Sequence, residues 1–142
     1  ALDALNESEI REVYLLGRRG PMQAAFTNPE VRELGKMMDA HAVTLPHEVE
    51  LDDDTRAELE TSKDQSTINK IEILKSFCDP AGHVKQRQLH IRFLVSPIEI
   101  LGDENGRVRG VKLVKNELYR DDSGEIRSRA TEEYEELEAG IV

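Results

Sequence analysis

Near its start the chain reads Val13-Tyr14-Leu15-Leu16-Gly17-Arg18-Arg19-Gly20-Pro21. The apolar residues that open this segment predict a buried parallel strand over 12–18, and the glycines that follow allow a tight turn. Proline suits the first position of a helix, whose free N–H groups and dipole favour anions. Two adjacent arginines add planar groups that can grip a phosphate with paired hydrogen bonds. The segment therefore predicts an anion site between a strand and a helix.

The arginine pair also indicates which anion would bind. In a βαβ unit, an arginine after the second strand is where NADP enzymes hold the adenosine 2′-phosphate, whereas NAD enzymes usually place an acid there. Arg18 and Arg19 therefore favour NADP over NAD. The alternative interpretation is a solvated surface loop, because protein surfaces are rich in arginine.

Two longer segments carry a resemblance to a known family. GRRGPMQAAFT over 17–27, followed by EVREL over 30–34, resembles the NADP-binding domain of the adrenodoxin reductase family of NADPH-ferredoxin reductases. RFLVSPIEI over 92–100 resembles the same family at the corresponding distance. The resemblance covers most of residues 10–142 and is weakest between 48 and 88. It implies an α/β fold, in which a small parallel sheet flanked by helices is followed by an antiparallel β-meander, as in a partial Rossmann-like NADP domain of the glutathione-reductase type.

The resemblance implies the NADPH-binding segment of an FAD-dependent ferredoxin-NADP reductase. NADPH would pass a hydride to FAD, and a ferredoxin-type iron–sulfur protein would accept the electrons. The glycine fingerprint of dinucleotide sites is absent from the sequence, and so is the family's FAD domain. Residues 1–9 look like the end of the helix that follows that fingerprint in the family. We therefore expect residues 1–142 to be a single partial NADP-binding domain that binds no FAD and is inactive alone.

An alternative function is a non-catalytic interaction module that kept only the fold. With the first strand of the sheet absent, the strand over 12–18 would present an unpaired edge. Such an edge invites self-association, so a homodimer is the expected assembly under this alternative.

The resemblance also assigns individual residues. Arg18 and Arg19 match the family's 2′-phosphate arginines, and Glu30 matches an acid near the nicotinamide ribose. Arg32 matches an arginine that docks ferredoxin-type partners, although a solvated surface charge explains it equally simply. Glu30 also completes Thr27-Asn28-Pro29-Glu30, a capping box with Thr27 as N-cap, and this explains it without a ligand.

The remaining members of the expected cofactor site contribute chiefly through geometry. Gly17 and Gly20 shape the turn, and Gln23 would hydrogen-bond either the ligand or the backbone. No residue is a convincing nucleophile or general base, so we expect no catalytic residue here. Hydride transfer between NADPH and FAD is the chemistry of the cofactors.

Composition excludes several other classes of function. The net charge of −10 over 142 residues disfavours nucleic acid and anionic membranes as partners. The single cysteine, Cys78, excludes an internal disulfide, and the four histidines lack the spacing of a metal site. No apolar run is long enough to cross a bilayer. These features predict the cytoplasm, or the mitochondrial matrix in a eukaryote.

Periodicity and turn signals predict the remaining elements. We expect a helical turn or two over 21–26, a capped helix to about residue 39, a strand within 41–49 and a helix after Asp52-Asp53-Asp54. A stripe at helical spacing follows, formed by Ile68, Ile71, Leu74, Phe77 and Cys78 and closed by residues 79–82. From Leu89 to Val95 the period is two, and Pro97 interrupts it. The turns Asn105-Gly106 and Asp121–Gly124 then separate the strands of the meander. The resemblance to the family implies that a last strand begins near 140–142.

Overall fold

The computed structural model describes residues 7–79 and 85–142, and its chain divides into two compact units. The first unit holds the chain up to Leu15 together with Phe26–Ile91, and the second holds Leu16–Ala25 together with Arg92–Val142. Each unit is built around one three-stranded sheet. The arginine turn, residues 17–20, belongs to the second unit.

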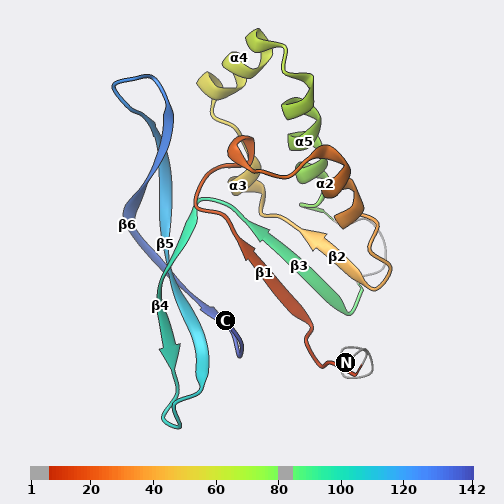
Figure 1. Ribbon diagram of the computed structural model, residues 1–142, viewed down its shortest axis with the longest axis vertical. Coiled ribbons are helices and arrows are strands. Elements are labelled where there is room, and N and C mark those ends of the chain that lie inside the picture. Colours follow the sequence, from red (N-terminus) through yellow and green to blue (C-terminus); the bar gives the residue numbers. More distant parts are fainter. Residues whose placement is uncertain (1–6, 80–84) are drawn as a thin grey trace. The chain divides into compact units, whose positions relative to one another are not determined.

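The first unit contains the parallel sheet. Its strands are β1 (Glu12–Leu16), β2 (Ala40–Val43) and β3 (Arg87–Arg92), in the order β1-β3-β2. β2 pairs in parallel with β3, with Ala40 opposite Arg87 and Val43 opposite His90. All three arrows point the same way in Figure 1. On the other side of β3, β1 is an edge strand of this sheet as far as the described residues show, in agreement with the expected unpaired edge.

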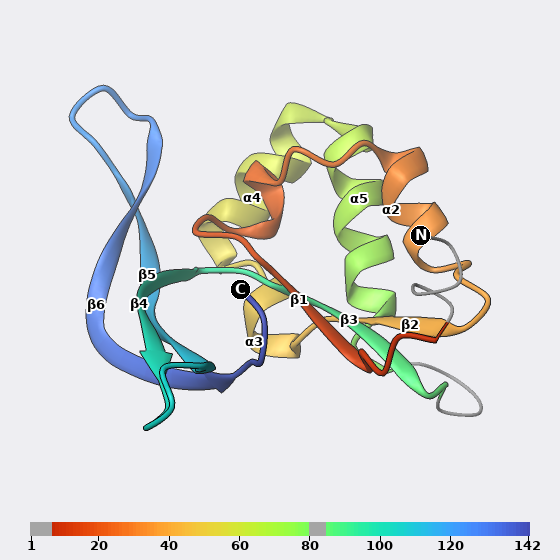
Figure 2. The same ribbon diagram turned by 60° about the horizontal axis from the view of Figure 1, so that its bottom comes forward.

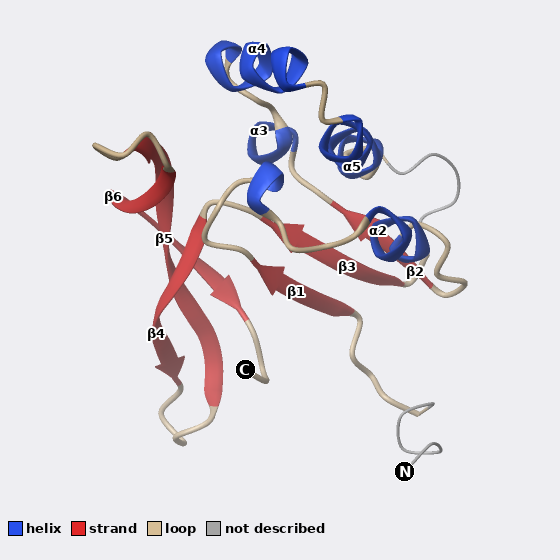
Figure 3. Cartoon of the chain, turned by 45° about the horizontal axis from the view of Figure 1, so that its top comes forward, coloured by secondary structure: helices blue, strands red, loops and turns tan. Residues whose placement is uncertain are grey.

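Helices cover one face of this sheet, as Figures 2 and 3 show for α2 and α5. The four helices of the unit are α2 (Asn28–Leu34), α3 (Pro46–Val49), α4 (Asp53–Ser62) and α5 (Gln65–Ser76). The predicted apolar stripe on α5 faces the core, since Ile71 and Leu74 are buried. Thr44, which follows β2, donates its hydroxyl hydrogen to the carbonyl oxygen of Leu74 at 2.7 Å. That bond ties the sheet to α5.

The second unit contains the antiparallel meander. Its strands are β4 (Val95–Gly102), β5 (Val108–Arg120) and β6 (Ile126–Glu138), hydrogen-bonded in that order. Val95, Val111 and Leu113 form its buried core. Gly106 and Gly124 have φ angles of 74° and 83°, which glycine adopts without strain, so both predicted hairpin turns are confirmed. The fold as a whole confirms the expected class, a small parallel sheet with helices followed by a meander.

One boundary differs from the sequence prediction for a clear reason. The period of two from Leu89 to Val95 predicted one strand, but β3 ends at Arg92 and β4 begins at Val95. The chain turns at Leu94, whose φ of 56° lies in the left-handed region. Pro97, expected to interrupt the strand, lies within β4 beside a register shift. Alternating hydrophobicity continued across the turn because Ile91, Phe93 and Val95 are each buried.

The helices and strands near the N-terminus are shorter than predicted. The expected helix over 21–26 is a three-residue 3₁₀ turn, η1 (Pro21–Gln23), and it ends where Ala24 becomes extended, with ψ of 132°. α2 stops at Leu34 rather than near residue 39. The strand expected within 41–49 ends at Val43, because Pro46 opens α3.

Some expectations fall elsewhere. Most of the helix end expected over 1–9 and of the turn over 79–82 lies outside the described residues. Residues 139–142 lie beyond the end of β6 and form no strand. Within the described ranges, no helix is long and apolar enough to cross a membrane.

Candidate functional site

The turn between β1 and η1 is held in place by hydrogen bonds that its carbonyl oxygens accept. Val95 donates its N–H to the carbonyl oxygen of Gly17 at 3.1 Å, and Leu94 donates to that of Arg19 at 3.2 Å. The carbonyl oxygen of Arg18 accepts from the Nδ2 of Asn116 at 2.9 Å. The three consecutive carbonyl groups of residues 17–19 therefore all have donors from the second unit.

This arrangement places the carbonyl and N–H groups of the turn on opposite sides. In a trans peptide the C=O and the following N–H point in opposite directions. Since the carbonyl oxygens of residues 17–19 face the donors near β4 and β5, the N–H groups of Arg18, Arg19 and Gly20 point away from those donors. Among residues 7–79 and 85–142 these three N–H groups have no acceptor. Arg18 and Arg19 are exposed, so their N–H groups are available to an anion, whereas Gly20 is buried.

The side chains of Arg18 and Arg19 likewise carry donors without a partner in the described part of the chain. Both are exposed, and neither guanidinium group has an ion pair with any residue that the structure describes. Other arginines of the second unit differ: Arg92 meets Glu135 at 2.8 Å, and Arg129 meets Glu117 at 2.6 Å. The positive charge of Arg18 and Arg19 is therefore available to a ligand.

Gly17 and Gly20 fit tightly where the sequence analysis placed them. A Cβ on Gly17 would lie 3.3 Å from the carbonyl oxygen of Arg92, so the backbone approach there leaves little room for a side chain. A Cβ on Gly20 would lie 3.1 Å from both the Oε1 of Gln23 and the Cδ1 of Leu118. Gly20 is extended, with φ of −77° and ψ of 174°, so space rather than backbone strain explains this glycine.

Gln23 ends η1 with its side chain partly buried. Its Oε1 is buried and has no hydrogen-bond partner in the described part of the chain. A buried amide oxygen without a donor is costly, so this atom is an acceptor open to a ligand group or to water. The very short η1 has no substantial dipole, and the expectation that a helix N-terminus strengthens the anion site is wrong.

Glu30 and Arg32 lie on α2, in the first unit. The capping box is confirmed: Thr27 donates its N–H to the Oε2 of Glu30 at 2.7 Å, and its Oγ1 accepts from the N–H of Glu30 at 3.5 Å. Hydrogen bonding to the Glu30 carboxyl by Thr27, first from its backbone N–H and then from its side chain, lowers the pKa of that carboxyl. Arg32 is exposed in the last turn of α2. The cap gives Glu30 a structural role without a ligand.

The sequence analysis did not identify two residues that help to hold the arginine turn, Asn116 and Ser96. Asn116 and Ser96 are hydrogen-bonded to each other at 2.8 Å, from Nδ2 to Oγ. Asn116 lies between Lys115 and Glu117, so its polar character gave no signal in the sequence. As for metals, no group of three or more histidine, cysteine or acidic residues that could hold an ion occurs among the described residues.

Comparison with known proteins gives consistent matches, although no family model matches the chain. NADPH-ferredoxin reductase FprA of Mycobacterium tuberculosis is 38% identical over 144 residues, spanning all of this chain and 30% of the relative. The mitochondrial NADPH:adrenodoxin oxidoreductase of Arabidopsis thaliana is 34% identical over 148 residues, again across the whole chain and 30% of the relative. The resemblance to the adrenodoxin reductase family is confirmed.

A solved structure agrees with this relationship. The structure of M. tuberculosis FprA in complex with NADPH matches with a TM-score of 0.83 and 36% identity, covering 99% of this chain and 30% of that one. The chain thus spans about 30% of the length of these relatives and matches one segment of them. These similarities support the reductase interpretation, and neither supports the alternative of a non-catalytic module.

Proposed function

We propose that this chain is part of the NADP-binding domain of an FAD-dependent NADPH-ferredoxin reductase, and that Arg18 and Arg19 bind the 2′-phosphate of NADPH. The arginine turn carries this proposal. Within the described part of the chain its two guanidinium groups have no ion pair and the N–H groups of residues 18–20 have no acceptor, while the carbonyl oxygens of residues 17–19 all have donors. A phosphate at this turn would meet donors and positive charge only.

Other residues of the turn complete the proposed site. Gly17 and Gly20 keep the backbone close to its supports, and the Oε1 of Gln23 accepts from a ligand hydroxyl or amine. Bound NADPH supplies the hydride, which passes to FAD held elsewhere in the whole enzyme, with a ferredoxin-type protein as acceptor. This chain contributes the choice of NADPH over NADH and no catalytic residue.

We propose two roles for α2 in the same enzyme. Glu30 lies near the nicotinamide ribose when NADPH is bound, while still capping α2. Arg32, exposed on α2, contributes to docking of the acidic iron–sulfur partner, since the net charge of −10 requires any such contact to use local positive groups. For the compartment we retain the cytoplasm, or the mitochondrial matrix in a eukaryote.

Calorimetric titration with 2′,5′-ADP, using 5′-AMP as the control, tests the central proposal. We expect binding of 2′,5′-ADP that is weakened by about 1.5 to 3 kcal/mol in Arg18→Ala and in Arg19→Ala, and weak or undetectable binding of 5′-AMP. Equal affinity for the two nucleotides would mean that the turn does not read the 2′-phosphate.

A second proposal concerns assembly and rests on the edge strand. Ile10, Val13 and Leu15 are 50%, 51% and 42% exposed on or just before β1. An open groove of about 310 Å³ beside them is lined in part by Met37 and Leu89. We propose that the 142-residue chain alone self-associates through β1. Light scattering should find dimers of the chain and monomers of Val13→Lys, and a chain that stays monomeric at high concentration would refute this proposal.

A further inference from the structure

Asn116 occupies an irregular point of β5. The pairing of β5 with β6 shifts between Val114, which lies opposite Tyr134, and Asn116, which lies opposite Ala130. At this shift the N–H of Asn116 donates to the carbonyl oxygen of Leu94 at 2.7 Å. The backbone of Asn116 is therefore anchored to the link between β3 and β4.

The side chain of Asn116 has both amide hydrogens committed. Its Nδ2 donates to the carbonyl oxygen of Arg18 at 2.9 Å and to the Oγ of Ser96 at 2.8 Å. Two acceptors on one NH₂ group fix the plane and the direction of the carboxamide. The bond to Arg18 joins residues 98 positions apart in the sequence.

Among the carbonyl groups of residues 17–19, that of Arg18 alone accepts its hydrogen bond from a side chain of the described residues. Those of Gly17 and Arg19 accept from the backbone N–H groups of Val95 and Leu94. Such backbone bonds survive most substitutions, whereas the third donor exists only because residue 116 is asparagine. The orientation of the peptide between Arg18 and Arg19 thus depends on the identity of the side chain at position 116.

We infer that Asn116 is a positioning residue for the arginine turn, holding the Arg18 carbonyl away from a bound phosphate so that the Arg19 N–H faces it. The argument rests on the proposed function, since it names what prepares that site. If the peptide turned over, a carbonyl oxygen would face the anion and one N–H donor would be lost. Asn116 itself touches no ligand.

The test compares Asn116→Ala and Asn116→Asp with matched changes at Asn105, an exposed residue of the β4–β5 turn. Asn116→Ala removes the donor, and Asn116→Asp keeps the size while replacing the donor group with an acceptor. We expect Asn116→Ala to weaken 2′,5′-ADP binding about three- to tenfold, the range for one neutral hydrogen bond, and Asn116→Asp to weaken it more. Asn105→Ala and Asn105→Asp should bind like the parent chain.

A second readout separates positioning from loss of stability. In unliganded Asn116→Ala, the amide NMR signals of Arg19 and Gly20 should shift while those of the β5–β6 turn stay in place, with the cooperative thermal unfolding transition retained. If both Asn116 variants bind 2′,5′-ADP as tightly as the parent chain while Arg18→Ala binds it more weakly, the positioning role is overturned and the proposed function stands. If the parent chain itself does not bind 2′,5′-ADP, the proposed function fails and the positioning role with it.

Discussion

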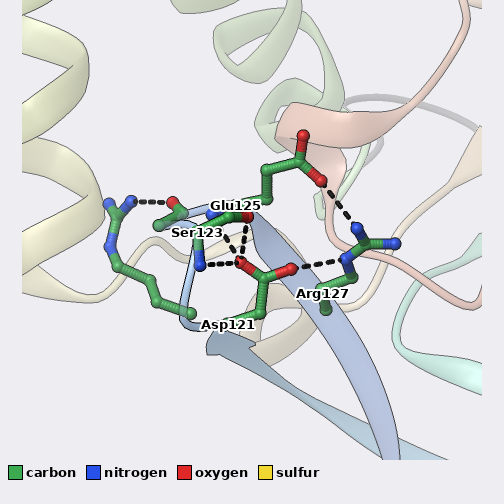
Figure 4. Close-up of polar contacts among 6 residues, drawn as sticks. Asp121, Ser123, Glu125 and Arg127 are labelled. Atoms are coloured by element: carbon green, nitrogen blue, oxygen red, sulfur yellow. Dashed lines mark hydrogen bonds and ion pairs between the residues drawn. The ribbon is translucent and has the colours of Figure 1, made fainter.

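Two turns of the second unit carry arginines in opposite states. At residues 17–20 the guanidinium groups of Arg18 and Arg19 have no ion pair in the described part of the chain. At the β5–β6 turn, Arg127 donates from Nε to the Oδ2 of Asp121 and from a terminal nitrogen to the Oε2 of Glu125, both at 2.8 Å (Figure 4). The arginines at these two turns therefore differ in whether their positive charge is already paired with a carboxylate.

The difference shows why the type of residue alone does not identify an anion site. In the β5–β6 turn, Asp121 also accepts from the hydroxyl of Ser123 and from the N–H groups of Ser123 and Glu125. The hydrogen bond from the Ser123 hydroxyl, followed by that from Arg127, lowers the pKa of the Asp121 carboxyl to about 2. The polar groups of this turn therefore hydrogen-bond to one another. In the arginine turn, by contrast, the carbonyl oxygens of residues 17–19 accept hydrogen bonds from β4, β5 and Leu94, and the guanidinium groups have no partner among the described residues.

The largest effect expected from this contrast concerns ligand binding. Arg18→Ala or Arg19→Ala should each weaken 2′,5′-ADP binding by about 1.5 to 3 kcal/mol, the range for hydrogen bonds to charged groups. Arg127→Ala removes the same charge from the paired turn and should leave the affinity unchanged. Calorimetry on the three variants measures both. A comparable loss in Arg127→Ala would mean that net charge, not the turn, governs binding.

A smaller effect should affect stability and not binding. Gly124 has a φ of 83°, so Gly124→Ala places a side chain in the left-handed region and should cost about 1 kcal/mol of unfolding free energy. Denaturant unfolding measures this cost, and Gly140→Ala, where a Cβ meets no atom within 4 Å, is the control. The affinity for 2′,5′-ADP should not change in either variant. A stability equal to that of the parent chain would show that the turn relaxes around alanine.

The smallest effect is a local dependence on pH. Because the folded pKa of Asp121 lies near 2, below the ordinary value of 3.8, its contribution to stability is complete above about pH 4 and is lost as pH falls towards 2. Asp121→Asn should abolish this dependence. NMR titration of the carboxyl signals measures it, and a midpoint near 3.8 for Asp121 would contradict the bonded turn.

Local sequence signals predicted much of the fold. Asn105-Gly106 and Asp121–Gly124 gave both hairpin turns, and Thr27 with Glu30 gave the start of α2, because each motif satisfies its own backbone groups within a few residues. The break at Leu94 could not be predicted in this way. Its left-handed backbone belongs to a residue that disfavours it, and it is held by the long-range bond to Asn116.

The candidate site likewise has a part that the sequence predicted and a part that it did not. Arg18, Arg19 and the two glycines were visible as a motif, and their resemblance to a family gave the proposed ligand. The donors that bind the turn's carbonyl oxygens come from residues 94, 95 and 116, which no local pattern connects to residues 17–19. Which arginines are already paired likewise depends on cross-strand neighbours, as for Arg129 and Glu117.

The most direct test of the contrast follows the arginine side chains themselves. In a ¹⁵N-labelled chain titrated with 2′,5′-ADP, the Nε–Hε signals of Arg18 and Arg19 should move with the same saturation curve, while those of Arg127 and Arg129 stay in place. Movement of all four signals together, or of Arg127 and Arg129 alone, would contradict the claim that the unpaired turn is the phosphate site.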